Sequence, residues 1–243
     1  MESTKDPGKP MSNPTQYQPA GPQGAMEPLR LVAVSAGISV PSSTRLLTDR
    51  LAQATEAAAA ESGRPAEVRV VELRDLATDI ANNMVTGFPS PALAEVLDAV
   101  TAADGLIAVT PIFSGSYSGL FKSFFDVMDN TALDGKPVLI AATGGTQRHS
   151  LALEHALRPL FAYLRAIVAP TAVYAASQDW GTDVDPHHDE LATRIARAGR
   201  ELAGFVLCAP GGTRSRAKSA DPTDQADEDD VVPFAQQLAA LGQ

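Results

Sequence analysis

Hydroxyl side chains gather in one short stretch of the sequence, "SAGISVPSST", which runs from Ser35 to Thr44. Gly37 permits a tight turn, and Ser42, Ser43 and Thr44 stand at the expected start of a helix. A helix N-terminus offers unpaired backbone N–H groups and the positive end of the helix dipole, and hydroxyls add donors without the bulk of lysine. The stretch therefore predicts a phosphate-binding loop.

Two sequence features that this loop lacks limit the kind of phosphate ligand it could bind. It has neither the glycine spacing of a dinucleotide-binding fingerprint nor the lysine of a nucleoside triphosphate loop. Arg45 is the only nearby cation, so little positive charge is available for a polyphosphate. A single phosphate monoester on a small cofactor fits better. The alternative, a serine-rich helix cap that binds nothing, stays open.

Two further loops carry exposed backbone, "PIFSGSYSG" from Pro111 and "TGGTQRHS" from Thr143. Each follows an expected buried strand, and loops that follow neighbouring parallel strands gather at one edge of a sheet. A flat heteroaromatic ring suits such loops, with Ile112 and Phe113 against one face and main-chain groups along the rim. The candidate binding residues here are Pro111, Ile112, Phe113, Ser114, Ser116, Thr143, Gly144 and Gly145.

Alternating strands and helices between residues 29 and 207 would bring the three loops together. Short apolar runs predict strands at residues 29–36, 66–73, 104–110, 135–143 and 166–176. Amphipathic runs predict helices at residues 42–62, 91–103, 117–128, 150–164 and 189–207. A loop is expected through Asn82, Asn83, Gly87 and Pro89. Five such repeats predict an α/β protein, a three-layer doubly wound sandwich with a five-stranded parallel sheet.

The two ends of the chain differ from the middle in composition. Residues 1–28 are polar and rich in proline and glycine, which predicts a disordered leader. Residues 209–243 predict an acidic flexible tail, because residues 221–230 contain six acidic side chains and no basic one. The amphipathic segment around Phe234 fits docking on the domain or on a second subunit. One domain, residues 29–208, is expected between the two ends.

Composition narrows the classes of function. The net charge of −10 argues against a nucleic-acid surface, and no apolar run is long enough to span a membrane. Cys208 is the only cysteine, so no intrachain disulfide can form and a reducing, cytoplasmic setting is expected. His187 and His188 lack the spacing of a recognised metal site, and no metal is predicted.

The three loop motifs together resemble one protein family. The serine-rich loop, "PIFSGSYSGLFK" and "TGG" are similar to the NAD(P)H-dependent FMN reductases, which have a flavodoxin-like fold, and the likeness covers residues 29–207. The resemblance implies FMN and NADPH or NADH as cofactors. It also implies that Ser35, Ser42, Ser43 and Thr44 hold the FMN phosphate, and that residues 111–114 and 143–145 hold the isoalloxazine. Many members carry an arginine inside the phosphate loop, whereas residues 38–43 contain none.

A narrower resemblance concerns the partner protein. "TGGTQRHSLALEHALRPLFAYLRA" and "QDWG" are similar to FMN reductases that partner luciferase-like flavin monooxygenases, and we expect a homodimer or homotetramer. Hydride then passes from nicotinamide to flavin, so no catalytic side chain is expected. Two alternatives remain, a quinone or azo-dye reductase that retains FMN and a flavodoxin-like electron carrier without turnover. The missing "TGxT" pattern counts against the carrier.

Four more side chains have both a functional and an ordinary interpretation. Lys122 matches a lysine of the family, and it also fits a solvated helix face. Arg148 and His149 fit contact with the nicotinamide cofactor or its 2′-phosphate, and a capping or interface role suits His149 equally. Trp180 fits a cover over a neighbouring subunit's flavin or a plug that closes the core.

Overall fold

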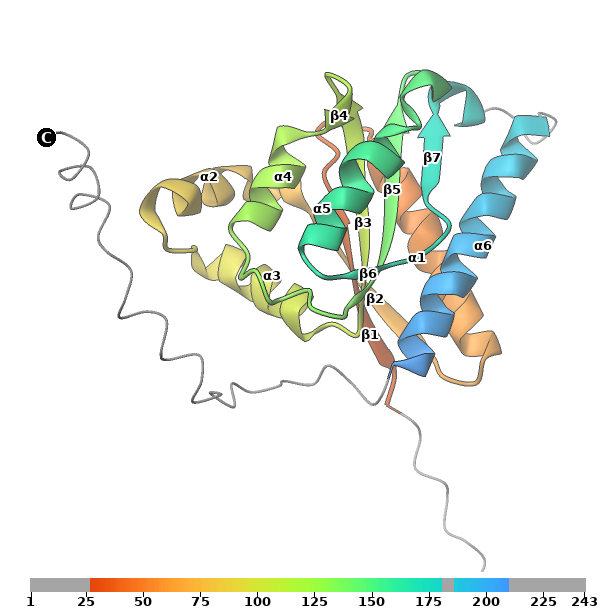
Figure 1. Ribbon diagram of the computed structural model, residues 1–243, viewed down its shortest axis with the longest axis horizontal. Helices are drawn as coiled ribbons and strands as arrows, with labels where there is room; N and C mark the ends of the chain where they lie inside the picture. The colour runs from red at the N-terminus through yellow and green to blue at the C-terminus, as the bar shows by residue number, and fades with distance from the viewer. Residues whose placement is uncertain (1–26, 181–185, 210–243) are drawn as a thin grey trace, which may run out of the picture.

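The computed structural model describes residues 27–180 and 186–209, which form three layers (Figure 1). The expected leader and acidic tail lie almost wholly outside the described residues. One face of the central sheet is covered by helices α1 (Ser43–Glu61) and α6 (Pro186–Cys208). The other face is covered by α3 (Pro91–Ala102), α4 (Gly119–Asp126) and α5 (Arg158–Tyr163). None of the described helices is long and apolar enough to span a bilayer.

The sheet confirms the predicted doubly wound parallel arrangement. Its order is β2-β1-β3-β5-β6, from strands β2 (Ala66–Glu72), β1 (Leu29–Ser35), β3 (Gly105–Phe113), β5 (Pro137–Gly144) and β6 (Ile167–Val168). β7 (Val173–Ala176) also pairs in parallel with β5. The predicted fifth strand is therefore divided into two short strands, β6 and β7, which both pair with β5. β4 (Ser116–Tyr117) pairs antiparallel with β3. Among the described residues the sheet therefore has seven strands, where five were expected.

Strand residues alternate between two cores, as expected for a sheet covered on both faces. In β1, Val32 and Val34 belong to the core under α3, α4 and α5, whereas Leu31 and Ala33 belong to the core under α1 and α6. The predicted apolar face of α4 is confirmed. It buries three aromatic rings, and two of them contact a fourth ring on α5; the four residues are Phe121, Phe124, Phe125 and Phe161.

The prediction of a loop through Asn82 and Asn83 is wrong. These residues lie in helix α2 (Ala77–Thr86), which follows a short 3-10 turn, η1 (Leu73–Leu76). Ile80 is fully buried, and burial of this side outweighs the weak helix propensity of the paired asparagines. Gly87 ends the helix in the left-handed conformation, with φ of 76°.

Two prolines account for two further differences from the predicted elements. The expected helix over residues 150–164 contains a π-helical turn, η3 (Leu153–Leu157), directly before α5. Pro159 has no N–H to continue an α-helical ladder, which fits a wider turn at this point. Pro170 lies in the gap between β6 and β7 and has no N–H for the sheet, so the predicted single strand is interrupted.

Candidate functional site

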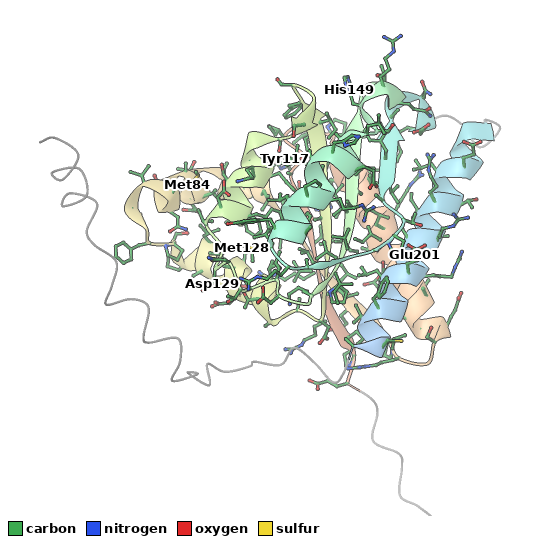
Figure 2. All side chains as sticks on the ribbon, viewed as in Figure 1. Met84, Tyr117, Met128, Asp129, His149 and Glu201 are labelled. Carbon is green, nitrogen blue, oxygen red and sulfur yellow. The ribbon has the colours of Figure 1, made fainter. Side chains whose placement is uncertain are left out.

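The structure brings the three predicted loops to the same edge of the sheet. β1, β3 and β5 are neighbours, with Ser35 beside Val109 and Pro111 beside Thr143. The loops that follow these strands therefore leave from one edge, as doubly wound sheets require. Figure 2 shows Tyr117 of β4 and His149 toward that upper end, with Asp129 and Glu201 farther from it.

Ser35 ends β1 with a buried hydroxyl that lacks a partner. The residue is 1% exposed, and its Oγ has no hydrogen bond to any described residue. Gly37 follows in a tight space, because an added Cβ would lie 2.1 Å from the Ser42 Oγ and 3.0 Å from the Thr44 Cβ. The unpaired Ser35 hydroxyl thus lies beside a tight turn and the start of α1. A phosphate oxygen at this position could accept a hydrogen bond from that hydroxyl.

The start of α1 confirms the predicted helix cap. Ser42 is the N-cap residue, and its Oγ accepts a hydrogen bond from the Arg45 backbone N–H at 3.2 Å. Its own hydroxyl hydrogen is left for another acceptor. Ser43 is exposed at the first helical position, where the backbone N–H has no partner within the helix. Ser42 and Ser43 thus stand beside the predicted phosphate position.

Thr44 has a further partner that the sequence did not indicate. Its hydroxyl shares a 2.8 Å hydrogen bond with the hydroxyl of Thr143, and both side chains are buried. Either oxygen could be the donor, so the pair has one hydroxyl hydrogen left for a ligand. The bond joins the first turn of α1 to the end of β5.

The segment from Pro111 to Ser116 is a β-hairpin rather than an irregular loop. Phe113 pairs with Ser116, and the turn residues Ser114 and Gly115 have positive φ of 50° and 82°. Positive φ at both central residues is the type I′ geometry that suits tight hairpins. Phe113 is 49% exposed, so part of its side chain is accessible to a planar ligand. Tyr117 lies in β4, although its spacing predicted helix.

Tyr174 of β7 forms a hydrogen bond with the loop after β5. The Tyr174 hydroxyl donates to the Thr146 carbonyl at 2.8 Å, and a Cβ on Gly144 would lie 2.1 Å from that hydroxyl. Burial, and then the negative charge of Asp179, raises the pKa of Tyr174. The phenol therefore stays protonated as a donor. Gly145 is exposed, with its backbone accessible beside Gly144.

Asp179 supplies a second support, which the sequence argument missed. It lies in η4 (Ser177–Trp180), is 1% exposed, and accepts hydrogen bonds from the Ala176 N–H at 2.8 Å and the Gln147 amide at 3.2 Å. Arg194 of α6 comes within 4.0 Å of the carboxylate. Asp179 thus fixes Gln147 in η2 (Gln147–His149), next to Arg148. The only sequence signal was an acidic residue inside "QDWG".

The remaining sequence candidates are less involved. Lys122 forms an ion pair with Asp126 on the same helix, which favours the solvated-face interpretation. Trp180 packs beside the core under α1, with the Arg50 guanidinium 5.2 Å from its ring centroid, which favours closure of the core. Arg148 and His149 are exposed. The side chains of His187 and His188 lie outside the described residues.

A cavity of about 380 Å³ lies at the other end of β1, away from these loops. It is bounded by the start of β1, the middle of β2 and the end of α3; its lining residues include Arg30, Arg69 and Ala103. It holds none of the loop residues that predict cofactor binding. The candidate site is therefore formed by loops at the sheet edge and not by this cavity. In the described parts of the chain, no group of three metal-ligating side chains occurs.

The fold and the loops define a flavodoxin-like α/β protein with a site suited to a phosphorylated planar cofactor. The family described as NADPH-dependent FMN reductase matches residues 29–181, and the chain belongs to this family. Membership confirms the predicted enzyme class, an NAD(P)H-dependent FMN reductase, and the predicted cofactors, FMN and a nicotinamide.

Individual relatives agree with this assignment. An FMN reductase (NADPH) of Pseudomonas aeruginosa is 43% identical over 155 residues, which are 63% of this chain and 80% of that protein. The NADH-dependent FMN reductase SfnF of Pseudomonas fluorescens is 39% identical over 177 residues, 72% of this chain and 91% of that protein. These two names differ in the nicotinamide that they specify.

Solved structures agree in fold. An oxidoreductase from Corynebacterium diphtheriae aligns with a TM-score of 0.71 and 46% identity, over 74% of this chain and 97% of that chain. A WrbA-like flavodoxin from Agrobacterium tumefaciens aligns with a TM-score of 0.52 at 17% identity, over 74% of this chain and 98% of that chain. The second likeness shows the shared flavodoxin-like fold alone.

Proposed function

We propose that this FMN reductase releases reduced FMN, and that a luciferase-like flavin monooxygenase consumes it. The observation that carries the proposal is the openness of the ring-binding loops. Phe113 and Gly145 are exposed, and the aromatic surface offered to a flavin is the half-exposed ring of Phe113. A flavin held mainly by its phosphate and by loop backbone can leave between turnovers, whereas an electron carrier needs a lasting site.

The residues present fit FMN. We propose that its phosphate binds the loop after β1, where the Ser35 hydroxyl is unpaired and Gly37 lies close to Ser42 and Thr44. The residues assigned to the phosphate are Ser35, Gly37, Ser42, Ser43 and Thr44. The residues assigned to the isoalloxazine are Pro111, Ile112, Phe113, Ser114, Ser116, Thr143, Gly144 and Gly145.

No side chain of the site needs to act as a nucleophile or general base. When bound, FMN supplies the redox chemistry, since its ring accepts a hydride from the nicotinamide. The chain contributes binding and orientation. Phe113 offers a face for stacking, Tyr174 and Asp179 hold the loop after β5, and exposed Arg148 fits the charge of a nicotinamide phosphate.

Anaerobic mixing tests release directly. With NAD(P)H and catalytic enzyme, excess free FMN should be bleached, and the rate should rise with added FMN. In air, oxygen should be consumed and peroxide formed. If oxidation of NAD(P)H requires a quinone or azo dye, and FMN acts only by filling the site, the protein is a reductase that retains its flavin. If NAD(P)H is not oxidised at all, it is an electron carrier.

A two-chamber experiment tests the monooxygenase partner. The reductase and a luciferase-like monooxygenase are separated by a dialysis membrane that passes flavin but not protein, under limiting oxygen. Product formed across the membrane would support transfer of free reduced FMN. Product formed only when the two proteins are mixed would show that transfer needs contact. No product in either arrangement would refute the partnership with that monooxygenase.

We also propose a cytoplasmic homodimer or homotetramer. Large apolar side chains are exposed on α2, on the following turn and on α5: Val85 at 87%, Phe88 at 81% and Tyr163 at 79%. Val85 and Phe88 lie three positions apart, and neighbouring exposed apolar side chains commonly mark interfaces. Light scattering on the eluted protein measures the mass, and a monomer at micromolar concentration would refute this proposal. The single cysteine supports a reducing compartment.

A further inference from the structure

The middle of the phosphate loop is held by an arginine from outside the loop. Arg74 lies in η1, just beyond β2, and its Nη1 donates to the Ser39 carbonyl at 3.2 Å. Within residues 27–180 and 186–209, this is the one hydrogen bond that reaches residues 38–41. Ile38 and Val40 are 55% and 81% exposed, so packing contributes little to their placement. The position of this segment therefore depends on Arg74.

Arg74 is itself fixed by Glu72 at the end of β2. Its Nη2 lies 3.0 Å from one Glu72 oxygen, and the other oxygen accepts from Arg45 Nη1 at 2.7 Å. Arg45 belongs to the first turn of α1. A single carboxylate thus ties the middle of the phosphate loop, through Arg74, to the helix start that closes the loop.

The charges in this cluster argue for a geometric role and not for a general attraction of phosphate. The two guanidinium groups face three carboxylates, because Arg45 also pairs with Asp49 at 2.8 Å and Arg74 with Asp75 at 3.5 Å. The hydrogen bond to Asp49 is the main cause of a raised pKa for Arg45. The cluster carries no net positive charge with which to attract an anion.

We infer that Arg74 is a positioning residue for the phosphate loop and thereby favours phosphorylated flavins over riboflavin. The inference rests on the proposed FMN phosphate site. Residues 38–43 contain no arginine, and the guanidinium that contacts Ser39 comes from η1. A carbonyl held by Arg74 cannot turn toward the phosphate, which would repel its partial negative charge. The planar fork of arginine meets Ser39 and Glu72 together, which lysine cannot reproduce.

Three variants of the full chain test this inference. Arg74→Met removes the fork and the charge, and Arg74→Lys removes the fork alone. Arg69→Met is the matched control, because Arg69 lies in β2, the strand that leads into η1, and forms a comparable 2.8 Å ion pair with Glu95, away from the loop. FMN and riboflavin affinities are measured by fluorescence titration. Hydrogen exchange of residues 37–43 is measured without flavin.

Both Arg74 variants should bind FMN about fivefold or more weakly, with riboflavin affinity changed by less than about twofold. Residues 37–43 should exchange faster in both variants, and the Arg69 control should match the wild type. Wild-type FMN affinity in Arg74→Lys would overturn the inference in favour of charge alone. Equal loss for both flavins with a lower Tm would reduce Arg74 to a fold-stabilising residue.

The same measurements distinguish failure of the proposed FMN phosphate site from failure of the inference about Arg74. If the wild-type protein itself bound no FMN, the proposed phosphate site would be wrong. Unchanged exchange at residues 37–43 in Arg74→Met would refute the positioning role whatever the ligand. If the wild type binds FMN and Arg74→Met binds it equally well, only the inference about Arg74 fails.

Discussion

Replacing Ser35 with alanine should change stability and FMN affinity in opposite directions. The residue is 1% exposed, and its hydroxyl has no partner within the described chain. A buried polar group without a partner costs about 1–3 kcal/mol. Alanine occupies the same space without that group, so the free energy of unfolding of the flavin-free protein should rise by about 1 kcal/mol, or about 2–4 °C in Tm.

FMN binding should weaken in the same variant. A hydrogen bond to a charged group contributes about 1.5–3 kcal/mol, so its loss should raise the FMN Kd by roughly 10- to 100-fold. Riboflavin has no phosphate and should bind Ser35→Ala as it binds the wild type. Calorimetric melting of the flavin-free protein and fluorescence titration with both flavins provide the two measurements.

Ser90→Ala is the matched control for this prediction. Ser90 caps α3, where its Oγ accepts from the Leu93 N–H at 3.2 Å, far along the chain from the phosphate loop. Loss of a helix cap should cost about 1 kcal/mol of stability and leave FMN affinity unchanged. If Ser35→Ala instead lowers Tm and weakens both flavins alike, the Ser35 hydroxyl is structural and its assignment to phosphate is wrong.

Three further perturbations test a loop support, a buried lysine and the domain limit. Asp179→Asn leaves one acceptor for the Ala176 and Gln147 donors, so it should cost about 1–3 kcal/mol of stability. Steady-state kinetics should show the KM for the nicotinamide cofactor raised more than the FMN Kd, and equal changes would contradict this role. Burial lowers the pKa of Lys136 from 10.5 to about 8, so between these values the unfolded chain holds more protons and stability should rise with pH. Chemical denaturation should show the free energy of unfolding of the wild type rising by roughly 2–3 kcal/mol relative to Lys136→Met between about pH 8 and pH 10.5. A difference between the two proteins that does not change with pH would refute the lowered pKa. A chain ending at Cys208 should remain folded and bind FMN, as circular dichroism and titration can check; loss of binding would make residues 209–243 part of the domain.

Features set by periodic patterns within one segment were predictable from the sequence. The face formed by Phe121, Phe124 and Phe125 repeats at helical spacing, and the structure buries all three. The α2 helix was missed because Asn82 and Asn83 favour turns, while the burial of Ile80 that overrides them depends on the whole fold. In α2, tertiary packing outweighs the local turn preference of the two asparagines.

The supports of the candidate site could not be predicted in the same way. Thr44 and Thr143 are 99 positions apart, and Arg74 reaches Ser39 across 35 positions. Such contacts depend on which strands become neighbours, and no spacing within one segment reports that. The loops themselves were visible, because glycine and hydroxyl residues directly after apolar runs have a local meaning. Their roles with FMN stay predictions.

The hydrogen bond between Thr44 and Thr143 gives the site a fixed length. It joins the first turn of α1, in the region assigned to the phosphate, to the end of β5, in the region assigned to the ring, with 2.8 Å between the two oxygens. Neither loop can move outward alone without leaving a buried hydroxyl unpaired. We therefore expect the pair to set the length of the chain that can connect phosphate and ring in a bound ligand. A flavin analogue with a shorter or longer connecting chain would satisfy one end of the site and miss the other.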